Sequence, residues 1–153
     1  MNKIELTNVS SIPSYTISNA ARLLHISVHT LRMYEREGLL IPFKKESNQR
    51  LYSDKDLERI RCIRKVLNED KIGIEGIRKL LSLIPCWGIV KCPAKERKVC
   101  KAYTGYSKPC WMLKHKNNVC ESKNCRDCDV YSSFGNCESI KDKLKELIVG
   151  SSK

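Results

Sequence analysis

The sequence lacks any long apolar run. Its 153 residues are 41% hydrophobic, but no stretch approaches the roughly 20 consecutive apolar residues that cross a bilayer. No secretory signal pattern opens the chain either. These absences predict a cytoplasmic protein without a membrane partner. Disulfides rarely persist in a reducing cytosol, so the nine cysteines of the chain need another explanation.

Motifs of catalysis are missing as well. The sequence contains no glycine-rich phosphate-binding loop, no nucleophile elbow and no convincing pair of carboxylates. Its acidic residues stand next to lysines or arginines, as they do on solvated helix faces. We therefore do not expect an enzyme.

Acidic residues are scarce compared with basic ones. The chain has 17 Asp and Glu against 29 Lys and Arg, for a net charge of +12. A surplus of this size indicates a polyanionic partner, most commonly nucleic acid. The alternative is a basic surface that only keeps the protein soluble.

The first half of the chain carries the start and stop signals of two short helices. Thr16 can cap a helix that runs through about Leu24, with apolar residues at helical spacing. After a brief turn, Ser27 can cap a second helix from Val28 to about Glu37, which Gly38 ends in a left-handed conformation. Two helices joined by so tight a turn predict a helix-turn-helix unit.

A wing and two further helices are expected to follow. Residues 41–52 contain the polar tip "KKESNQ" and predict two short strands. The motif "SDKD" (residues 53–56) is a capping-box pattern for a helix through about Glu69. A last helix is expected over residues 74–83, before Pro85. This half is therefore predicted to be a three- to four-helix core with a wing.

The second predicted helix, in "HTLRMYEREGLL" (residues 29–40), interleaves apolar, aromatic and cationic side chains. In a helix-turn-helix unit this helix enters the major groove. Arg32 can offer a bidentate fork to guanine, and Tyr34 can pack its ring on the core while its hydroxyl reaches a phosphate. Further candidate DNA contacts are His29, Thr30, Arg36, Lys44, Lys45, Arg50 and Tyr52. Alternatively, Arg32 and Arg36 pair with neighbouring glutamates on a solvated helix, and Tyr34 is only a core residue.

Three stretches, "YTISNAARLLHISVHTLRMYEREGLLIP", "NQRLYSDKDLERIRCIRKVL" and "IGIEGIRKLL", resemble the DNA-binding domain of the MerR family of bacterial transcription regulators. The resemblance covers residues 15–83, about half of the chain. It implies a winged helix-turn-helix fold, promoter or operator DNA and RNA polymerase as partners, and a homodimer. By similarity, the residues that contact operator DNA are Thr16, Thr30, Arg32, Tyr34, Arg50 and Tyr52.

The sequence departs from the family pattern at several points. Met33 stands where many relatives carry a second aromatic residue, and Lys71 stands where a turn glycine is usual. Gly76 is expected to weaken the last helix by ~1 kcal/mol relative to alanine. Relatives usually continue into a long dimerising helix, whereas only the short amphipathic segment 138–148 offers a replacement here.

Eight of the nine cysteines fall in the second half, with the spacing C86-x5-C92-x7-C100-x9-C110-x9-C120-x4-C125-x2-C128-x8-C137. Two loose repeats open with Cys-Trp and close on a tyrosine, Tyr103 in the first and Tyr131 in the second. The "CRDC" motif allows two thiolates of one turn to bind one metal. The candidate metal ligands are Cys86, Cys92, Cys100, Cys110, Cys120, Cys125, Cys128 and Cys137.

Four interpretations of these cysteines remain open: a structural zinc site, an iron–sulfur cluster that senses redox or metal stress, direct sensing through changing ligation, and a disulfide scaffold. Trp87 and Trp111 are placed to shield a centre from water, and nearby lysines are expected to lower the thiol pKa values. Some MerR relatives, the SoxR-type sensors, carry a cysteine-ligated iron–sulfur cluster, although with another spacing. Cys137, in the first turn of a final helix, is a ligand, a reactive thiol or an ordinary half-buried cysteine, whereas Cys62 is expected to pack and not to bind a metal.

These features predict a mainly α protein: a flexible tail (1–13), a winged helix-turn-helix domain (14–85), a small loop-rich cysteine module stapled by a metal or cluster (86–137), and a C-terminal amphipathic helix and tail (138–153). The expected function is transcription regulation, with the cysteine module sensing redox or metal state through an iron–sulfur cluster or zinc. The alternatives are an architectural DNA-binding protein with a purely structural zinc module, and a redox or electron-transfer protein.

Overall fold

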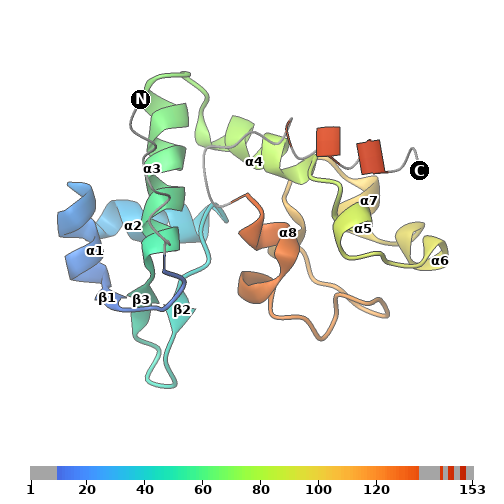
Figure 1. Cartoon of the computed structure of the whole chain (residues 1–153), viewed down its shortest axis with the longest axis horizontal. Coiled ribbons are helices and arrows are strands. Elements are labelled where there is room, and N and C mark those ends of the chain that lie inside the picture. The colour runs from blue at the N-terminus through green and yellow to red at the C-terminus, as the bar shows by residue number, and fades with distance from the viewer. Residues whose placement is uncertain (1–9, 135–141, 143–144, 147–148, 151–153) are drawn as a thin grey trace.

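The computed structural model describes residues 10–134, 142, 145–146 and 149–150. Four longer helices and a small sheet form one part of the molecule, and the cysteine segment lies beside them as a series of short helices and loops (Figure 1). The predicted tail lies largely outside the described residues, as do Cys137 and most of the final amphipathic helix. The proposed boundaries between the parts remain predictions.

The helices of the first part are α1 (Ile17–Leu24), α2 (Val28–Arg36), α3 (Asp54–Asn68) and α4 (Ile74–Ser82). Its strands are β1 (Tyr15–Thr16), β2 (Phe43–Lys44) and β3 (Arg50–Tyr52). The sheet is antiparallel in the order β1-β3-β2. The helix-turn-helix unit α1–α2 and the wing β2–β3 agree with the prediction, whereas strand β1 was not anticipated because two residues show no alternation.

Side-chain caps fix where these helices begin. The Thr16 side chain accepts a hydrogen bond from the Asn19 amide at the start of α1, and Ser27 does the same for Thr30 in α2. Ser53 and Asp56 form the complete capping box of α3. Each cap satisfies backbone donors that the first helical turn leaves without partners.

Buried apolar side chains from all four helices and the sheet fill the core of the first part: Ala20, Ala21, Leu24, Leu31, Tyr34, Leu39, Leu40, Tyr52, Leu57, Ile60, Ile63 and Ile77. Burial of this apolar surface is the main term that favours folding. The core therefore packs α2 against α1 and α3.

The second part is built from single turns of helix. These are α5 (Cys86–Ile89), α6 (Ala94–Arg97), α7 (Lys101–Thr104), η1 (Cys110–Met112), η2 (Cys125–Asp127) and α8 (Asp129–Ser132). Its apolar cluster has only three buried residues, Ile84, Val130 and Phe134, with partly buried cysteines and Trp111 packed on them. Its single turns and loops agree with the predicted loop-rich architecture, whereas stapling by a metal or cluster stays a prediction.

The structure explains the residues at two positions where the sequence departs from the family pattern, Lys71 and Gly76. Lys71 occupies the left-handed region with φ of 56°, the conformation for which glycine is the favoured residue. At Gly76, an added Cβ would lie 2.8 Å from Cγ2 of Ile72. Alanine at position 76 would therefore have to displace the Ile72 side chain. In the described part of the chain, no helix is long and apolar enough to cross a membrane.

Candidate functional site

The exposed face of α2 is cationic. His29, Arg32 and Arg36 are exposed on it, while Leu31 and Tyr34 of the same helix are buried. Within the described residues, the side chains of Arg32 and Arg36 form no ion pair. The alternative in which these arginines pair with Glu35 and Glu37 is therefore wrong.

Glu35 instead joins α2 to the wing. Its carboxylate lies 3.0 Å from Nζ of Lys44 and accepts two hydrogen bonds from the Arg50 guanidinium. Burial alone would raise the pKa of Glu35, but the hydrogen bonds from Arg50 and Lys44 outweigh it and lower the pKa. Two predicted DNA contacts, Lys44 and Arg50, thus hold the wing to α2, the helix predicted to enter the major groove (the recognition helix).

The two predicted tyrosines lie in the core. Tyr34 is buried, so its ring packs in the core as predicted. The contact of its hydroxyl with a phosphate remains a prediction. Tyr52 is 0% exposed, burial raises its pKa to about 12, and its buried hydroxyl has no hydrogen-bond partner among the described residues. A direct DNA contact by Tyr52 does not fit this burial, because no part of its side chain reaches the surface.

The remaining predicted DNA contacts lie at the ends of elements. Thr16, the N-cap of α1, and Thr30, in the first turn of α2, are half-buried. The Thr30 hydroxyl lies 2.9 Å from that of Ser27. Lys45 is exposed in the wing tip, where its amide donates to the carbonyl of Gln49. Their contacts with the DNA backbone remain predictions.

The second part surrounds one cavity lined by seven cysteines. They are Cys86, Cys92, Cys100, Cys110, Cys120, Cys125 and Cys128. All seven are half-buried free thiols. Among the described residues no group of three or more Cys, His, Asp or Glu side chains could hold a metal ion, so their role as metal ligands remains a prediction. Cys62, on α3, is disulfide-bonded, so it is not a free thiolate ligand, but the bond itself was not expected from the sequence.

Burial changes the acidity of these thiols in the opposite direction from that expected. It raises the pKa of Cys86 to about 11, and raises the pKa values of Cys110, Cys120 and Cys125, with neighbouring thiols acting in the same direction. Lys123 acts to lower the pKa of Cys120 but does not overcome these effects. The expected lowering of the thiol pKa values is therefore wrong for these four residues, since desolvation disfavours thiolate.

The two predicted repeats have matching aromatic pairs. The rings of Trp87 and Tyr103 meet edge to face with centroids 5.0 Å apart, and those of Trp111 and Tyr131 do so at 5.2 Å. In each repeat, the tryptophan after the first cysteine thus packs on the tyrosine that closes the repeat. All four rings line the thiol cavity, so the tryptophans lie where a shield against water was expected.

The second repeat docks onto the backbone that follows α2. The Trp111 indole donates to the Gly38 carbonyl at 2.7 Å, and the Tyr131 hydroxyl accepts from the Ile41 amide at 2.9 Å. Gly38 has φ of 74°, and an added Cβ would lie 2.1 Å from Sδ of Met112. Gly38 is therefore required both for its left-handed turn and for this close approach.

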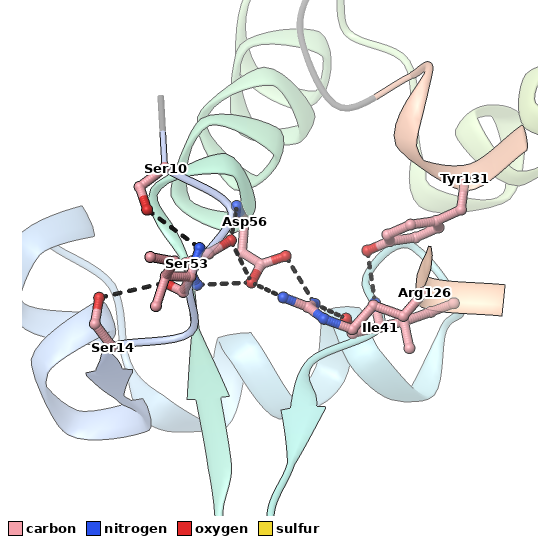
Figure 2. Close-up of polar contacts among 8 residues, drawn as sticks. Ser10, Ser14, Ile41, Ser53, Asp56, Arg126 and Tyr131 are labelled. Carbon is pink, nitrogen blue, oxygen red and sulfur yellow. Dashed lines mark hydrogen bonds and ion pairs between the residues drawn. The ribbon is translucent and has the colours of Figure 1, made fainter. Parts of the chain in front are cut away.

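Arg126 and Asp56 form a buried ion pair across the same interface. The guanidinium donates to both carboxylate oxygens, at 2.9 and 2.7 Å, and also to the Ile41 carbonyl. Figure 2 shows that one carboxylate serves both the capping box of α3, through Ser53, and Arg126 of the cysteine segment. The start of α3 thus depends on the same group that holds η2.

Arg59 of α3 adds a second cation to the interface. It donates to the carbonyls of Leu39, at 3.1 Å, and Tyr131, at 2.9 Å, and its guanidinium lies 3.7 Å from the centroid of the Tyr131 ring. Burial lowers the pKa of Arg59. The roles of Arg59, Asp56 and Arg126 at this interface were not predicted from the sequence, because their partners lie far away in the chain. The one local signal was Arg59, a charged residue on the apolar side of α3.

The fold and the cationic helix define a winged helix-turn-helix domain. Residues 15–84 match the family described as MerR HTH family regulatory protein. These residues are a MerR-family helix-turn-helix domain, as the sequence resemblance implied. The match ends at residue 84, before the cysteine-rich segment begins.

Individual relatives agree with this assignment. HspR of Streptomyces coelicolor, named as a heat shock protein, is 35% identical over 82 residues, 54% of this chain and 53% of HspR. The HTH-type transcriptional regulator YyaN of Bacillus subtilis is 40% identical over 68 residues, 44% of this chain and 49% of YyaN. The HTH-type transcriptional regulator MlrA of Escherichia coli is 36% identical over 69 residues, 44% of this chain and 28% of MlrA.

The chain spans about half the length of the first two of these relatives and less of the third. No solved structure matches the chain significantly.

Proposed function

We propose that the chain is a transcription regulator that binds operator DNA through α2 and the wing, and that its cysteine module senses redox or metal state through a thiolate-bound iron–sulfur cluster or zinc. Arg32 reads base edges in the major groove, while His29, Arg36 and Lys45 contact phosphates beside it. RNA polymerase and a second copy of the chain, each implied by the family, are the further partners of this proposal.

The observation that carries the regulatory part is the position of the docking contacts next to the thiols. Trp111 follows Cys110, and Arg126 follows Cys125. Their side chains bond to the carbonyl of Gly38 and to Ile41, which flank the turn between the recognition helix and the wing. A change at either cysteine therefore has a short covalent path to the segment that orients the DNA-binding elements.

The proposed mechanism uses two states of this interface. With the thiols ligated, η1 and η2 hold Trp111 and Arg126 against the turn, and α2 and the wing keep the relative orientation set by the Glu35 ion pairs. When ligation changes, these contacts are released or moved, and the angle between α2 and the wing changes with them. A ligand shifts such an equilibrium only by its differential affinity for the two states.

A second function is favoured by one observation, the burial of the Arg126–Asp56 pair. Its side chains are 12% and 6% exposed, so the interface is packed like a core. A module docked in this way suits an architectural DNA-binding protein in which zinc only staples the fold. Operator binding that is indifferent to the state of the thiols would favour this second function.

The DNA-binding part is tested by selecting genomic fragments with the full-length protein and measuring affinity by fluorescence anisotropy over a series of salt concentrations. We expect sequence-selective binding with a steep negative dependence of log affinity on log salt, because each neutralised phosphate releases counterions. Failure to enrich any fragment, by a protein shown to be folded, would contradict the proposal. An equal affinity for all fragments would indicate charge attraction without recognition.

A further inference from the structure

We infer that the cysteine module contacts DNA directly, through a strip of exposed lysines that binds the phosphate backbone beside the base pairs read by α2. This inference deepens the proposed function, on which it rests, because it adds a DNA-binding surface outside the helix-turn-helix domain. The lysine strip consists of Lys101, Lys114 and Lys116. Its charge, its continuity with the cationic face of α2 and the anchoring of the loop that presents it carry the inference.

The segment that presents the strip is strongly cationic. Residues 101–123 contain five lysines and a single acidic residue, Glu121, and all five lysines are exposed. Within the described part of the chain, none of these lysines forms an ion pair. The nearby carboxylates of Glu121 and Glu96 instead accept hydrogen bonds from the amides of Asn117 and Val119. The charge of the strip is therefore not neutralised within the described fold and attracts a polyanion.

The strip continues the cationic face of α2. One open cleft, of about 470 Å³, is lined by Arg36 at the end of α2, Lys44 of the wing and Met112 of the module. The acidic residue of this cleft, Glu35, is already paired with Lys44 and Arg50. A second cleft, of about 460 Å³, is lined by the same Met112 and by all three lysines of the strip. The two clefts therefore meet at Met112, and the cations of α2 and of the strip border one continuous surface.

The loop of the strip is anchored from inside the module. His115, between Lys114 and Lys116, donates from Nε2 to the Cys110 carbonyl at 2.9 Å, and its Nδ1 lies 3.4 Å from the side-chain amide of Asn118. His115 is half-buried and lines the thiol cavity, whereas both flanking lysines are exposed. A loop held in this way loses less conformational freedom on binding than a mobile loop would. The lysines are thus presented by a fixed backbone.

The strip-bearing loops and the wing lie on the same side of the molecule. Figure 1 shows the loops between α7 and α8 beside the wing, and in this view both extend downward, away from α4. Duplex DNA carries one phosphate charge per ~1.7 Å of its axis. A duplex held by α2 and the wing therefore brings phosphates alongside the strip. A lysine ammonium, as a point charge on a flexible stem, suits such a contact.

Charge complementarity favours DNA over a protein as the occupant. A second copy of this chain carries the same net charge of +12 and would be repelled by the strip, whereas DNA bound to α2 already presents phosphates there. Phosphate contacts fix the register of a protein on the duplex but carry no sequence information. The strip should therefore increase affinity and lengthen the contacted stretch of DNA without changing the preferred sequence.

The test compares two pairs of substitutions in the full-length protein. The strip variant carries Lys114→Ala and Lys116→Ala. The control carries Lys91→Ala and Lys95→Ala, which remove the same charge from exposed positions in and just before α6. Figure 1 shows α6 at the end of the module away from the wing. Affinity for the selected operator and for random DNA is measured by fluorescence anisotropy over a series of salt concentrations.

The strip variant should bind operator and random DNA several-fold more weakly at low salt, by the same factor on both. Its slope of log affinity against log salt should be shallower by about 1 for each lysine removed. The control should change the slope by less than about half as much, because its cations lie away from the duplex. Equal changes in the two variants would overturn the inference, since they would reflect net charge alone.

Two further measurements locate the contact. Lys114→Arg with Lys116→Arg keeps both cations and should retain the wild-type slope. Hydroxyl-radical footprinting should show that the alanine variant of the strip loses protection of sugars that flank the recognised base pairs and keeps protection at their centre. An unchanged footprint would contradict the inference, as would a shallower slope in the arginine variant. Lys114→Gln with Lys116→Gln replaces the alanine pair if circular dichroism shows a disturbed fold.

The wild-type protein, measured in the same experiment, keeps the two proposals apart. Selective binding by the wild type, with equal slopes for the strip variant and the control, would overturn the DNA contact of the module and leave the regulator in place. Binding of no DNA by the folded wild type would overturn both.

Discussion

The two parts of the molecule are stabilised in different ways. The helix-turn-helix domain encloses a core of twelve buried residues drawn from helices and sheet, whereas the apolar cluster at the cysteine module has three buried residues and lies beside a thiol-lined cavity. A small core rarely stabilises so many loops on its own. The comparison indicates that the first part folds through its apolar pattern, and that the second relies on docking to the first and, in our proposal, on ligation of its thiols.

If the proposed metal or cluster is bound, its removal should have the most different effects on the two parts. We expect a chelator to abolish hydrogen-exchange protection across residues 86–134 while the amides of α3 stay protected, because only the module depends on thiolate ligation. Hydrogen exchange followed by mass spectrometry measures both regions in one sample. Unchanged protection of the module would contradict this dependence.

Loss of the buried ion pair should be the largest effect of a single substitution. Arg126→Ala leaves the Asp56 carboxylate buried without its partner, and should lower the free energy of unfolding by about 3–5 kcal/mol. Denaturant titration measures this value. Lys123→Ala, which removes an exposed cation from the same segment, is the matched control and should change stability little. Equal effects of the two substitutions would show that the interface contributes nothing specific.

A substitution on the DNA-binding face should leave stability alone and change recognition. Arg32→Ala should weaken binding to the selected operator by ~1–3 kcal/mol and relax its sequence preference. Lys45→Ala should weaken binding to all sequences alike, since a phosphate contact carries no base information. Anisotropy titrations with operator and random DNA distinguish the two. Equal losses on both DNAs for Arg32→Ala would contradict base reading by this residue.

A substitution in the turn before α4 should increase the free energy of unfolding by a small amount. Lys71→Gly should raise the free energy of unfolding by up to about 1 kcal/mol, because a left-handed conformation strains any residue with a Cβ. Lys65→Gly, at an exposed position inside α3, should instead lower it by about 1 kcal/mol. Thermal unfolding of both variants provides the measurement, and destabilisation by both would rule out strain at position 71.

Acid should weaken the attachment of the wing to α2. The pKa of Glu35 is lowered in the folded protein from its ordinary value of 4.5, so its stabilising contribution is complete above that value and is lost as the pH falls through the lower folded pKa. The stability difference between wild type and Glu35→Gln should therefore shrink below pH 4.5. A difference that stays constant between pH 6 and roughly pH 3 would contradict this contribution.

Local signals explain why the helix-turn-helix domain was predictable. Thr16, Ser27 and Ser53 mark helix starts through their own side chains, and Gly38 marks a left-handed turn, so each element could be placed from a few neighbouring residues. Helical periodicity likewise assigned Leu31 and Tyr34 to the core. By contrast, the burial of Tyr52 depends on the packing of β3 against helices, which no local pattern encodes.

The cysteine module was predictable only in part. The repeated Cys-Trp openings and closing tyrosines anticipated two similar units, and the structure pairs Trp87 with Tyr103 and Trp111 with Tyr131. Docking of the second unit through Arg126 and Asp56, 70 residues apart, could not be inferred, because long-range ion pairs leave no spacing in the sequence. The raised thiol pKa values follow from this three-dimensional burial as well.

The most direct measurement compares the operator affinity of the full-length protein with its cysteine centre loaded and with the centre removed, at one salt concentration. We expect the two affinities to differ by roughly 5- to 150-fold, the usual range of coupling between two sites, and Arg126→Ala to reduce that difference. Identical affinities in the two states, with the centre verified by metal analysis, would contradict control of DNA binding by the cysteine module.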